Sequence, residues 1–279
     1  MNISIITINY NDITGLQRTL KSVQEQTVKD FEHIIIDGNS SDGSKELIQK
    51  TKDNYSYWVS EPDKGIYDAM NKGIAQANGN YVLFLNSGDT LYKNYIIHKV
   101  QPYLDNNTSI IYGDLSIISD DRPDFIHRYP KKLDFNFFKN TSLGHPATFI
   151  KKELFDLYGN YRTDLKIVSD WAFFLKTICV ENVSYKKIDV IISNFYEGGI
   201  STTVANVENH NSEIKKVLIE NYNLYDSNFN ELLKGKHLHD SVYSNVNEKI
   251  EIVSTNNFFI KIINLIISLF AFVLEKKRS

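Results

Sequence analysis

Short apolar runs alternate with stretches of helical periodicity along the first hundred residues. The apolar runs predict strands over residues 3–8, 31–36, 55–60 and 81–85. Between them, apolar residues recur at steps of three and four, which predicts helices whose inner faces carry Leu16, Leu20 and Val23 and, further on, Ile66, Ala69, Met70, Ile74 and Ala77. This β-α alternation is typical of an α/β fold with a largely parallel sheet.

Beyond residue 100 the pattern is less regular. Strands are expected over residues 109–113, 149–151 and 183–196, and a helix is expected over residues 170–181, with Trp171, Phe174, Leu175 and Ile178 on its inner face. Residues 114–144 follow neither period. From about residue 206 the polarity rises, so we expect an α/β domain over residues 1–205 and a mainly helical extension over residues 206–279.

Composition narrows the class of protein. The 279 residues are 42% hydrophobic, enough for a substantial core. A net charge of -3 disfavours broad binding to nucleic acid. One cysteine, Cys179, allows no intrachain disulfide, and the first residues lack the pattern of a signal peptide. We therefore expect a cytoplasmic protein.

Three acidic residues stand where apolar runs give way to a turn or a helix. Asp37 follows the second strand, Asp89 closes the turn after the fourth strand, and Asp170 opens the helix of residues 170–181. An α/β sheet presents ligand-binding side chains at such positions. Each residue also has a simpler interpretation, because Asp-Gly and Asn-Ser-Gly-Asp are turn formers and an aspartate at a helix start is a common N-cap.

The order of several motifs resembles one enzyme family. The segments ISIITINYN, IIIDGNSSDGS, SEPDKGIYDAMNKGIAQANGNYVLFLNSGD and LGHPATFIKKELF, followed by SDW, cover about residues 1–200. Together they resemble the family 2 glycosyltransferases, a hexosyltransferase type with the GT-A fold, and in particular bacterial enzymes that build O-antigen, capsule or exopolysaccharide repeat units. The implied fold is Rossmann-like, with a mostly parallel central sheet flanked by helices.

The resemblance also implies roles for particular residues. The nucleotide-sugar donor, expected to be a UDP-sugar, would be bound by residues that include Thr7, Asn9, Asp37, Asp63, Lys64, Asn71 and Ser87. Asp89 matches the last carboxylate of the family's Asp-x-Asp segment and would bind Mn²⁺ or Mg²⁺. Asn86 and Gly88 stand where many relatives have acids, and diphosphate oxygens would supply the remaining ligands.

The implied reaction is an inverting transfer of one sugar. Asp170 matches the family's general base, although the more common Glu-Asp pair is here Ser169-Asp170. His145 and Gly199 match elements near the acceptor and the diphosphate; without the family, His145 is a hydrogen-bonded structural residue and Gly199 part of a plain turn. His237, His239 and Asp240 resemble a metal cluster only superficially, because no further ligands complete a site.

Other functions stay open at this point. The chain is also compatible with a non-catalytic sugar-nucleotide binder or a membrane-tethered scaffold. A nucleotidyltransferase is disfavoured because TINYNDITG is not a basic glycine-rich loop, and a dinucleotide dehydrogenase because no G-x-G-x-x-G follows the first strand.

The last apolar segment, residues 258–274, interrupts its apolar run only at Lys261, Asn264 and Ser268. As a helix it is about 25 Å long, short for a hydrocarbon core of about 30 Å. The basic residues 276–278 follow it, so we expect a helix on the inner membrane face, close to a glycan or lipid-linked acceptor. Packing against the domain or a partner helix is the alternative, and homo-oligomers are compatible with the sequence.

Overall fold

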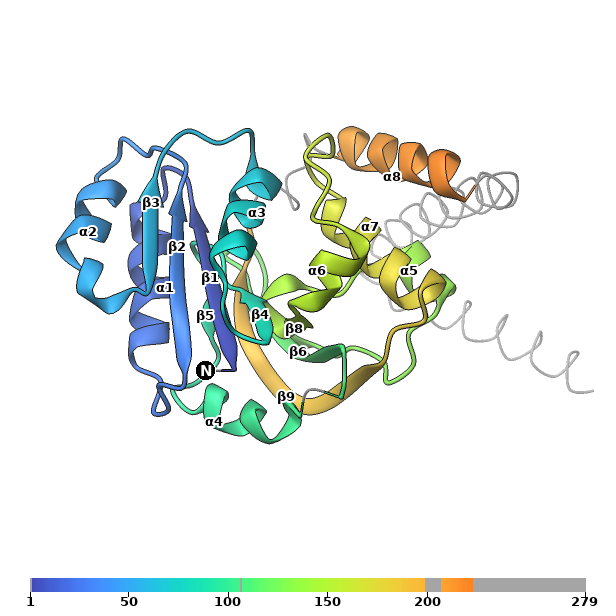
Figure 1. The fold of residues 1–279 in the computed structure, drawn as a ribbon, viewed down its shortest axis with the longest axis horizontal. Helices are drawn as coiled ribbons and strands as arrows, with labels where there is room; N and C mark the ends of the chain where they lie inside the picture. Colours follow the sequence, from blue (N-terminus) through green and yellow to red (C-terminus); the bar gives the residue numbers. More distant parts are fainter. Residues whose placement is uncertain (1, 106, 199–206, 223–279) are drawn as a thin grey trace, which may run out of the picture. The chain divides into compact units, whose positions relative to one another are not determined.

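A computed structural model describes residues 2–105, 107–198 and 207–222 of the chain (Figure 1). The chain divides into two units, Met1–Lys215 and Lys216–Ser279, and the contacts discussed below lie within the first. Four sequence predictions fall outside the described residues: the boundary near residue 205, Gly199, the His237–Asp240 segment and the apolar segment 258–274. They stay predictions.

The described strands form one mixed sheet. Its order is β3-β2-β1-β4-β8-β6-β9-β5, with β7 paired to β6. The strands are β1 (Ile3–Asn9), β2 (Phe31–Asp37), β3 (Tyr57–Ser60), β4 (Tyr81–Phe84), β5 (Thr90–Leu91), β6 (Ile110–Ile118), β7 (Phe125–His127), β8 (Thr148–Lys151) and β9 (Tyr185–Tyr196).

Helices connect and flank these strands (Figure 1). The α-helices are α1 (Ile13–Gln24), α2 (Ser44–Lys50), α3 (Ile66–Gln76), α4 (Ile96–Val100), α5 (Phe135–Asn140), α6 (Glu153–Tyr158), α7 (Ser169–Phe174) and α8 (Val207–Asn221). Short turns of other helix types are η1 (Lys52–Asn54), η2 (Gln101–Tyr103), η3 (His145–Ala147) and the π-helical η4 (Leu175–Val180).

The first four predicted strands are confirmed, and they pair in parallel. β1 lies between β2 and β4, and β3 extends the sheet beyond β2. Adjacent residues of β2 lie on opposite faces of the sheet. Ile35 packs with Leu16, Leu20 and Ile48 of α1 and α2. Ile36 lies under Gly73 of α3, on the other face. Helices therefore cover both faces, and burial on both sides explains the three consecutive isoleucines, residues 34–36, of β2.

Beyond β4 the sheet contains antiparallel strands. β8 runs antiparallel between β4 and β6, and β6 pairs with β7 and β9. β6 is longer than the predicted strand, because it continues past a bulge around Asp114 and pairs with β7 and β9 beyond it. A Cβ on Gly113 would lie 2.3 Å from the Val190 carbonyl oxygen, so only glycine permits this close approach.

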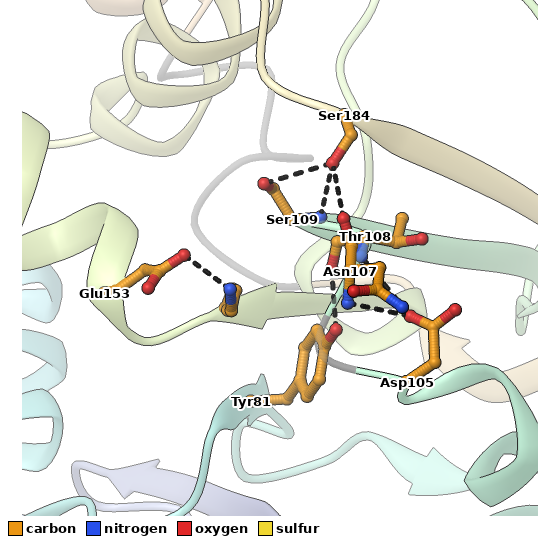
Figure 2. A network of polar contacts seen from close by, with 8 residues as sticks. Tyr81, Asp105, Asn107, Thr108, Ser109, Glu153 and Ser184 are labelled. Atoms are coloured by element: carbon orange, nitrogen blue, oxygen red, sulfur yellow. Dashed lines mark hydrogen bonds and ion pairs between the residues drawn. The ribbon is translucent and has the colours of Figure 1, made fainter.

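At the amino ends of β4, β6 and β9 a network of polar contacts joins the connecting loops (Figure 2). The Tyr81 hydroxyl donates to the Thr108 carbonyl oxygen at 2.6 Å. The Ser184 hydroxyl accepts from the Ser109 amide at 3.0 Å and donates to the Asn107 carbonyl oxygen at 3.2 Å. Asp105 accepts from the next loop amides. These contacts tie the start of β4 and the loops before β6 and β9 to one another, and so they stabilise the fold.

The predicted helix 170–181 consists of α7 followed by η4. Trp171, Phe174, Leu175 and Ile178 are buried, as the apolar spacing predicts. Phe173 is buried as well and stacks on Phe155 of α6, with ring centroids 4.7 Å apart. Within the described residues, no helix combines the length and the apolar character needed to cross a bilayer.

Candidate active site

The carboxyl ends of β1, β2 and β3 place three polar side chains in register. Asn9, Asp37 and Ser60 are direct pairing partners across the three strands. Asn9 Nδ2 donates to Asp37 Oδ1 at 2.7 Å, and the Ser60 hydroxyl donates to Asp37 Oδ2 at 2.6 Å. Ser40 adds its amide, 2.9 Å from Oδ2, and its hydroxyl on Oδ1. Asp37 is thus fully buried and accepts four hydrogen bonds.

The group formed by Asp37 and its partners Asn9, Ser40 and Ser60 is called the Asp37 corner below. Asp63 and Lys64 lie in the loop that leads into α3, beside this corner. Asp63 Oδ2 lies 2.6 Å from the position that a Cβ on Gly38 would occupy, so the carboxylate covers the glycine that follows Asp37. Asp63 Oδ1 accepts from the Gly65 amide at 2.9 Å. Lys64 is exposed, and its amide donates to Asp68 at 3.0 Å. Asp63 therefore borders the corner.

Two predicted donor-binding residues have their side chains directed into the protein. Thr7 is completely buried, and its hydroxyl lies 3.0 Å from Nε2 of His33 on β2. Burial lowers the pKa of His33 to about 3, so this imidazole is neutral. Asn71 bonds both ways with the backbone of Tyr161, donating to its carbonyl oxygen at 2.8 Å and accepting from its amide at 3.0 Å.

The turn after β4 is tied to the same corner. The Ser87 hydroxyl donates to Asn9 Oδ1 at 2.7 Å, so Asn9 bridges Asp37 and Ser87. Gly88 has a φ of +101°, a conformation that favours glycine. A side chain at position 88 would therefore strain the backbone of this turn.

The Asp89 side chain is buried, and few hydrogen bonds compensate for its loss of contact with water. Among the described residues, the Tyr196 amide donates to its Oδ1 at 3.4 Å. Burial raises the pKa of Asp89 to about 8, against the opposing effects of the Tyr196 amide and the Arg18 guanidinium. Arg18 of α1 donates to the Gly88 carbonyl oxygen at 2.9 Å and stacks on Tyr196, 3.8 Å from the ring centroid.

The Asp89 turn fits a divalent cation. Asn86 Oδ1, in the same turn, is buried and lacks a hydrogen-bond partner among the described residues. Asn86 and Asp89 thus offer the oxygen ligands that Mg²⁺ and Mn²⁺ prefer. The described residues contain no group of three or more His, Cys, Asp or Glu side chains that could hold a metal ion, so most ligands would come from the diphosphate or water.

Asp170 lies at the start of α7, but its side chain does not act as an N-cap. Residue 168 holds the N-cap position, and the Asp170 carboxylate is directed to other partners. The Tyr67 hydroxyl of α3 lies 2.8 Å from Oδ1, and His145 Nδ1 lies 3.7 Å from Oδ2. The Asp170 side chain is 22% exposed, so it is held by the protein and still open to a ligand.

The groups around Asp170 are neutral. Burial, with the nearby Asp170 charge, raises the pKa of Tyr67 well above its usual value, so the phenol keeps its proton and can donate. Burial lowers the pKa of His145, although Asp170 opposes the change. His145 Nε2 lies 2.9 Å from the Tyr161 hydroxyl, whose pKa is also raised by burial. The Asp170 carboxylate is thus surrounded by the neutral side chains of Tyr67, His145 and Tyr161.

Ring contacts place Asp170 at the same edge of the sheet as the other two carboxylates. His145 packs on Phe84, the last residue of β4, with centroids 5.2 Å apart. The chain then continues beside β1, where the Ser87 amide donates to the Ile8 carbonyl oxygen at 3.0 Å. Asp37, Asp89 and Asp170 thus lie around the carboxyl ends of β2, β1 and β4, the edge at which α/β sheets bind ligands.

Four residues of this site were missed at the sequence level: Arg18, Ser60, Tyr67 and Tyr161. Tyr67 lies beside the predicted inner face of α3, and its terminal hydroxyl was the available signal. Ser60 ends a predicted strand, as Asp37 does. Arg18 has no local signal, because a cation on an amphipathic helix is ordinarily a surface residue.

A family model described as Glycosyl transferase family 2 matches residues 4–157, more than half of the chain. The chain belongs to this family. An uncharacterized glycosyltransferase of Mycobacterium tuberculosis is 34% identical over 183 residues, which cover 64% of this chain and 69% of the relative. A PGL/p-HBAD biosynthesis glycosyltransferase of Mycobacterium bovis is 28% identical over 211 residues, covering 74% of this chain and 81% of that protein.

Solved structures identify the fold as GT-A. TarS 1-349 of S. aureus in complex with UDP-GlcNAc aligns with a TM-score of 0.64 and 18% identity, covering 84% of this chain and 70% of that chain. The mannosyltransferase PcManGT of Pyrobaculum calidifontis, in complex with GDP-Man and Mn²⁺, aligns with a TM-score of 0.59 and 14% identity, covering 78% and 63%. This family 2 glycosyltransferase therefore has the predicted fold and enzyme class.

Proposed function

We propose that this glycosyltransferase moves a sugar from a nucleotide-sugar donor, a UDP-sugar, to a hydroxyl of a glycan or lipid-linked glycan, with inversion at the anomeric carbon. The observation that carries the proposal is the Asp170 carboxylate. It is 22% exposed, is held by the Tyr67 hydroxyl and lies at the sheet edge that also carries Asp37 and Asp89. A partly exposed carboxylate fixed in this way suits a general base.

In the proposed reaction Asp170 is the proton acceptor. It accepts the proton of the acceptor hydroxyl while that oxygen forms a bond to the anomeric carbon. The bond from the anomeric carbon to the diphosphate oxygen breaks, and the nucleoside diphosphate leaves with the electron pair. A single displacement from the face opposite the leaving group inverts the centre. Burial lowers the pKa of His145, which makes its imidazole a weaker proton acceptor than usual, and the raised pKa of Tyr67 keeps the phenol protonated; both shifts support Asp170 in this role.

The nucleoside would be bound at the Asp37 corner. The Ser40 and Ser60 hydroxyls on Asp37 can rotate away, which would free the carboxylate to accept from a base N–H. Asp63, beside Gly38, would line the same pocket. At the other end, a Mn²⁺ or Mg²⁺ ion held by Asp89 would offset the negative charge of the departing diphosphate. The Mn²⁺ in the PcManGT complex supports a divalent cation.

The acceptor is proposed to belong to a cell-surface polysaccharide or glycolipid. The Mycobacterium bovis relative is named a PGL/p-HBAD biosynthesis glycosyltransferase, which supports a biosynthetic role. The sequence of residues 258–274, with the basic residues 276–278 behind it, supports attachment to the inner face of the membrane. Sedimentation of the full-length protein with anionic vesicles, and its absence from the pellet with neutral vesicles, tests this part of the proposal.

The donor and the chemistry are tested in two steps. A thermal-shift screen of UDP, GDP, CDP and dTDP, each with and without Mn²⁺ or Mg²⁺, should show the largest stabilisation with UDP plus metal. Release of nucleotide from the matching sugar donors, followed by NMR of the anomeric proton of the product, then establishes turnover and stereochemistry. Stabilisation by GDP, CDP or dTDP rather than UDP would reject the UDP-sugar donor, and retention of configuration would reject the single displacement.

A further inference from the structure

The loop that presents Asp170 is held by a carboxylate from the helix that follows the α/β core. Glu213 of α8 accepts hydrogen bonds from three consecutive backbone amides. Its Oε1 lies 2.7 Å from the Lys166 nitrogen, and its Oε2 lies 2.9 Å from the Ile167 nitrogen and 3.2 Å from the Val168 nitrogen. Consecutive amides that converge on one anion form a strong and directional anchor.

Tyr67 holds the same loop from α3. Its hydroxyl lies 2.6 Å from the Ile167 carbonyl oxygen and 2.8 Å from Asp170 Oδ1. A phenol has one proton to donate, and the carboxylate is the stronger acceptor because it is charged. The loop is thus fixed on one side through its amides and on the other through the base itself.

We propose that Glu213 and Tyr67 are positioning residues, which together hold the Asp170 carboxylate in the orientation that accepts the acceptor proton. This inference rests on the proposed role of Asp170 as the general base. It makes α8, which the sequence assigned to an extension, a part of the catalytic unit. Residues 166–168 lead directly into Ser169 and Asp170, so the amides that Glu213 holds and the carboxylate that accepts from Tyr67 belong to one short segment.

The two residues are expected to act on the rate and not on donor binding. Asp37 and Asp89, which are proposed to bind the donor, have no direct hydrogen bond to Glu213 or Tyr67 within the described residues. In Glu213→Gln one acceptor oxygen becomes an NH₂ donor, which faces backbone N–H groups. Tyr67→Phe removes the hydroxyl and keeps the ring. Each variant should lower kcat about tenfold or more and leave the Kd for UDP unchanged.

The pH dependence distinguishes a positioning role from general support of the fold. The titratable groups that face Asp170 are Tyr67, His145, Tyr161 and Tyr129. The Tyr67 hydroxyl contacts the Asp170 carboxylate directly, so in Tyr67→Phe the pH profile of kcat should differ from that of the wild type. Glu213→Gln lacks this effect, because Glu213 bonds to backbone amides and not to Asp170 itself.

The experiment uses full-length protein and three variants, Glu213→Gln, Tyr67→Phe and the control Glu208→Gln, an exposed carboxylate at the start of α8. Calorimetry measures UDP binding with Mn²⁺, and kcat is measured with the donor that the wild type turns over fastest. Hydrogen exchange of the peptide that contains residues 166–168 is measured in parallel, because it does not depend on an identified acceptor.

We expect faster exchange of this peptide and lower kcat in Glu213→Gln and Tyr67→Phe, with UDP affinity and Glu208→Gln at wild-type levels. Wild-type exchange or wild-type kcat in both variants would overturn the inference. An equal loss of UDP affinity and kcat would overturn it as well, because general disturbance of the site would then explain both. Full activity of Asp170→Asn is a separate result, which would refute the proposed base and not the anchoring of the loop.

Discussion

The corner at the end of β2 and the turn after β4 both bury an aspartate at the same edge of the sheet, yet the two carboxylates are bonded very differently. Asp37 accepts four hydrogen bonds, from Asn9, Ser60 and, twice, Ser40. Asp89 accepts one long bond, from the Tyr196 amide, and burial raises its pKa to about 8. A buried carboxylate with a full set of donors supports the fold, whereas one without them costs stability.

The contrast suggests that the two regions have different roles. The Asp37 corner is preorganised by the protein, since its partners come from β1, β3 and the loop after β2. The Asp89 turn has few hydrogen bonds, as expected for a site completed by a ligand. Asp170 belongs with the second region, because its carboxylate is held on one oxygen and remains partly exposed. Substitutions of Asp89 and Asp170 should therefore affect mainly the chemistry, whereas substitution of Asp37 should affect stability as well as nucleotide binding.

The largest effect is expected for Asp170→Asn. An amide cannot accept the acceptor proton, so donor turnover should fall about 10³-fold. The affinity for UDP should stay close to that of the wild type, because the change lies away from the Asp37 corner. Nucleotide release and calorimetry measure the two quantities. Residual turnover near the wild-type level would remove Asp170 from its role.

Asp89→Asn should separate the metal from the fold. The variant loses the carboxylate proposed to hold the cation, so turnover should fall about 10²-fold and the Mn²⁺-dependent part of the UDP thermal shift should disappear. The Tm without ligand should change by about 2 °C or less, because a carboxyl with a pKa of about 8 is mostly protonated at neutral pH and asparagine resembles it in shape. An unchanged Mn²⁺ effect would assign the cation to other ligands.

Asp37→Asn should differ from Asp89→Asn, because its main effect should be on the stability of the fold and not on the chemical step. Its NH₂ group would meet donors that now bond to the carboxylate, so the free energy of unfolding should fall by about 2–4 kcal/mol. Urea unfolding without ligand measures this change. Asp53→Asn, at an exposed carboxylate in η1, is the control. A stable Asp37→Asn protein would show that the four hydrogen bonds contribute little, and the contrast with Asp89 would then fail.

The smallest effect concerns the strand pair beneath the corner. His33 has a folded pKa of about 3 against an ordinary value of 6.5, so below pH 6.5 the unfolded chain binds the extra proton and stability falls as pH falls. At pH 5 the cost is about 2 kcal/mol relative to pH 7. His33→Gln, which does not titrate, should lose less stability over this interval than the wild type. His98→Gln, at an exposed histidine, should follow the wild type.

Much of the fold was predictable because the spacing of apolar residues along the chain indicates its strands and helices. β1, β2 and β4 are buried on both faces and are rich in apolar residues, and the buried faces of α1 and α3 have apolar residues at helical spacing. The strands of residues 114–144 were not predictable. There, β6 changes partners around the Gly113–Asp114 bulge and pairs with β7 in the opposite direction. Such pairing depends on residues elsewhere in the chain and leaves no period in the local sequence.

The sequence by itself determined where Asp37, Asp89 and Asp170 stand relative to strand ends and helix starts, and its motif order indicated the family. Only the tertiary structure decided what each side chain bonds to. It placed Thr7 against His33, engaged Asn71 with the Tyr161 backbone, and brought Tyr67 and Glu213 to the loop of Asp170. The physical reason is that strand and helix formation follow local apolar patterns, whereas hydrogen-bond partners 26 to 103 residues apart are chosen by packing.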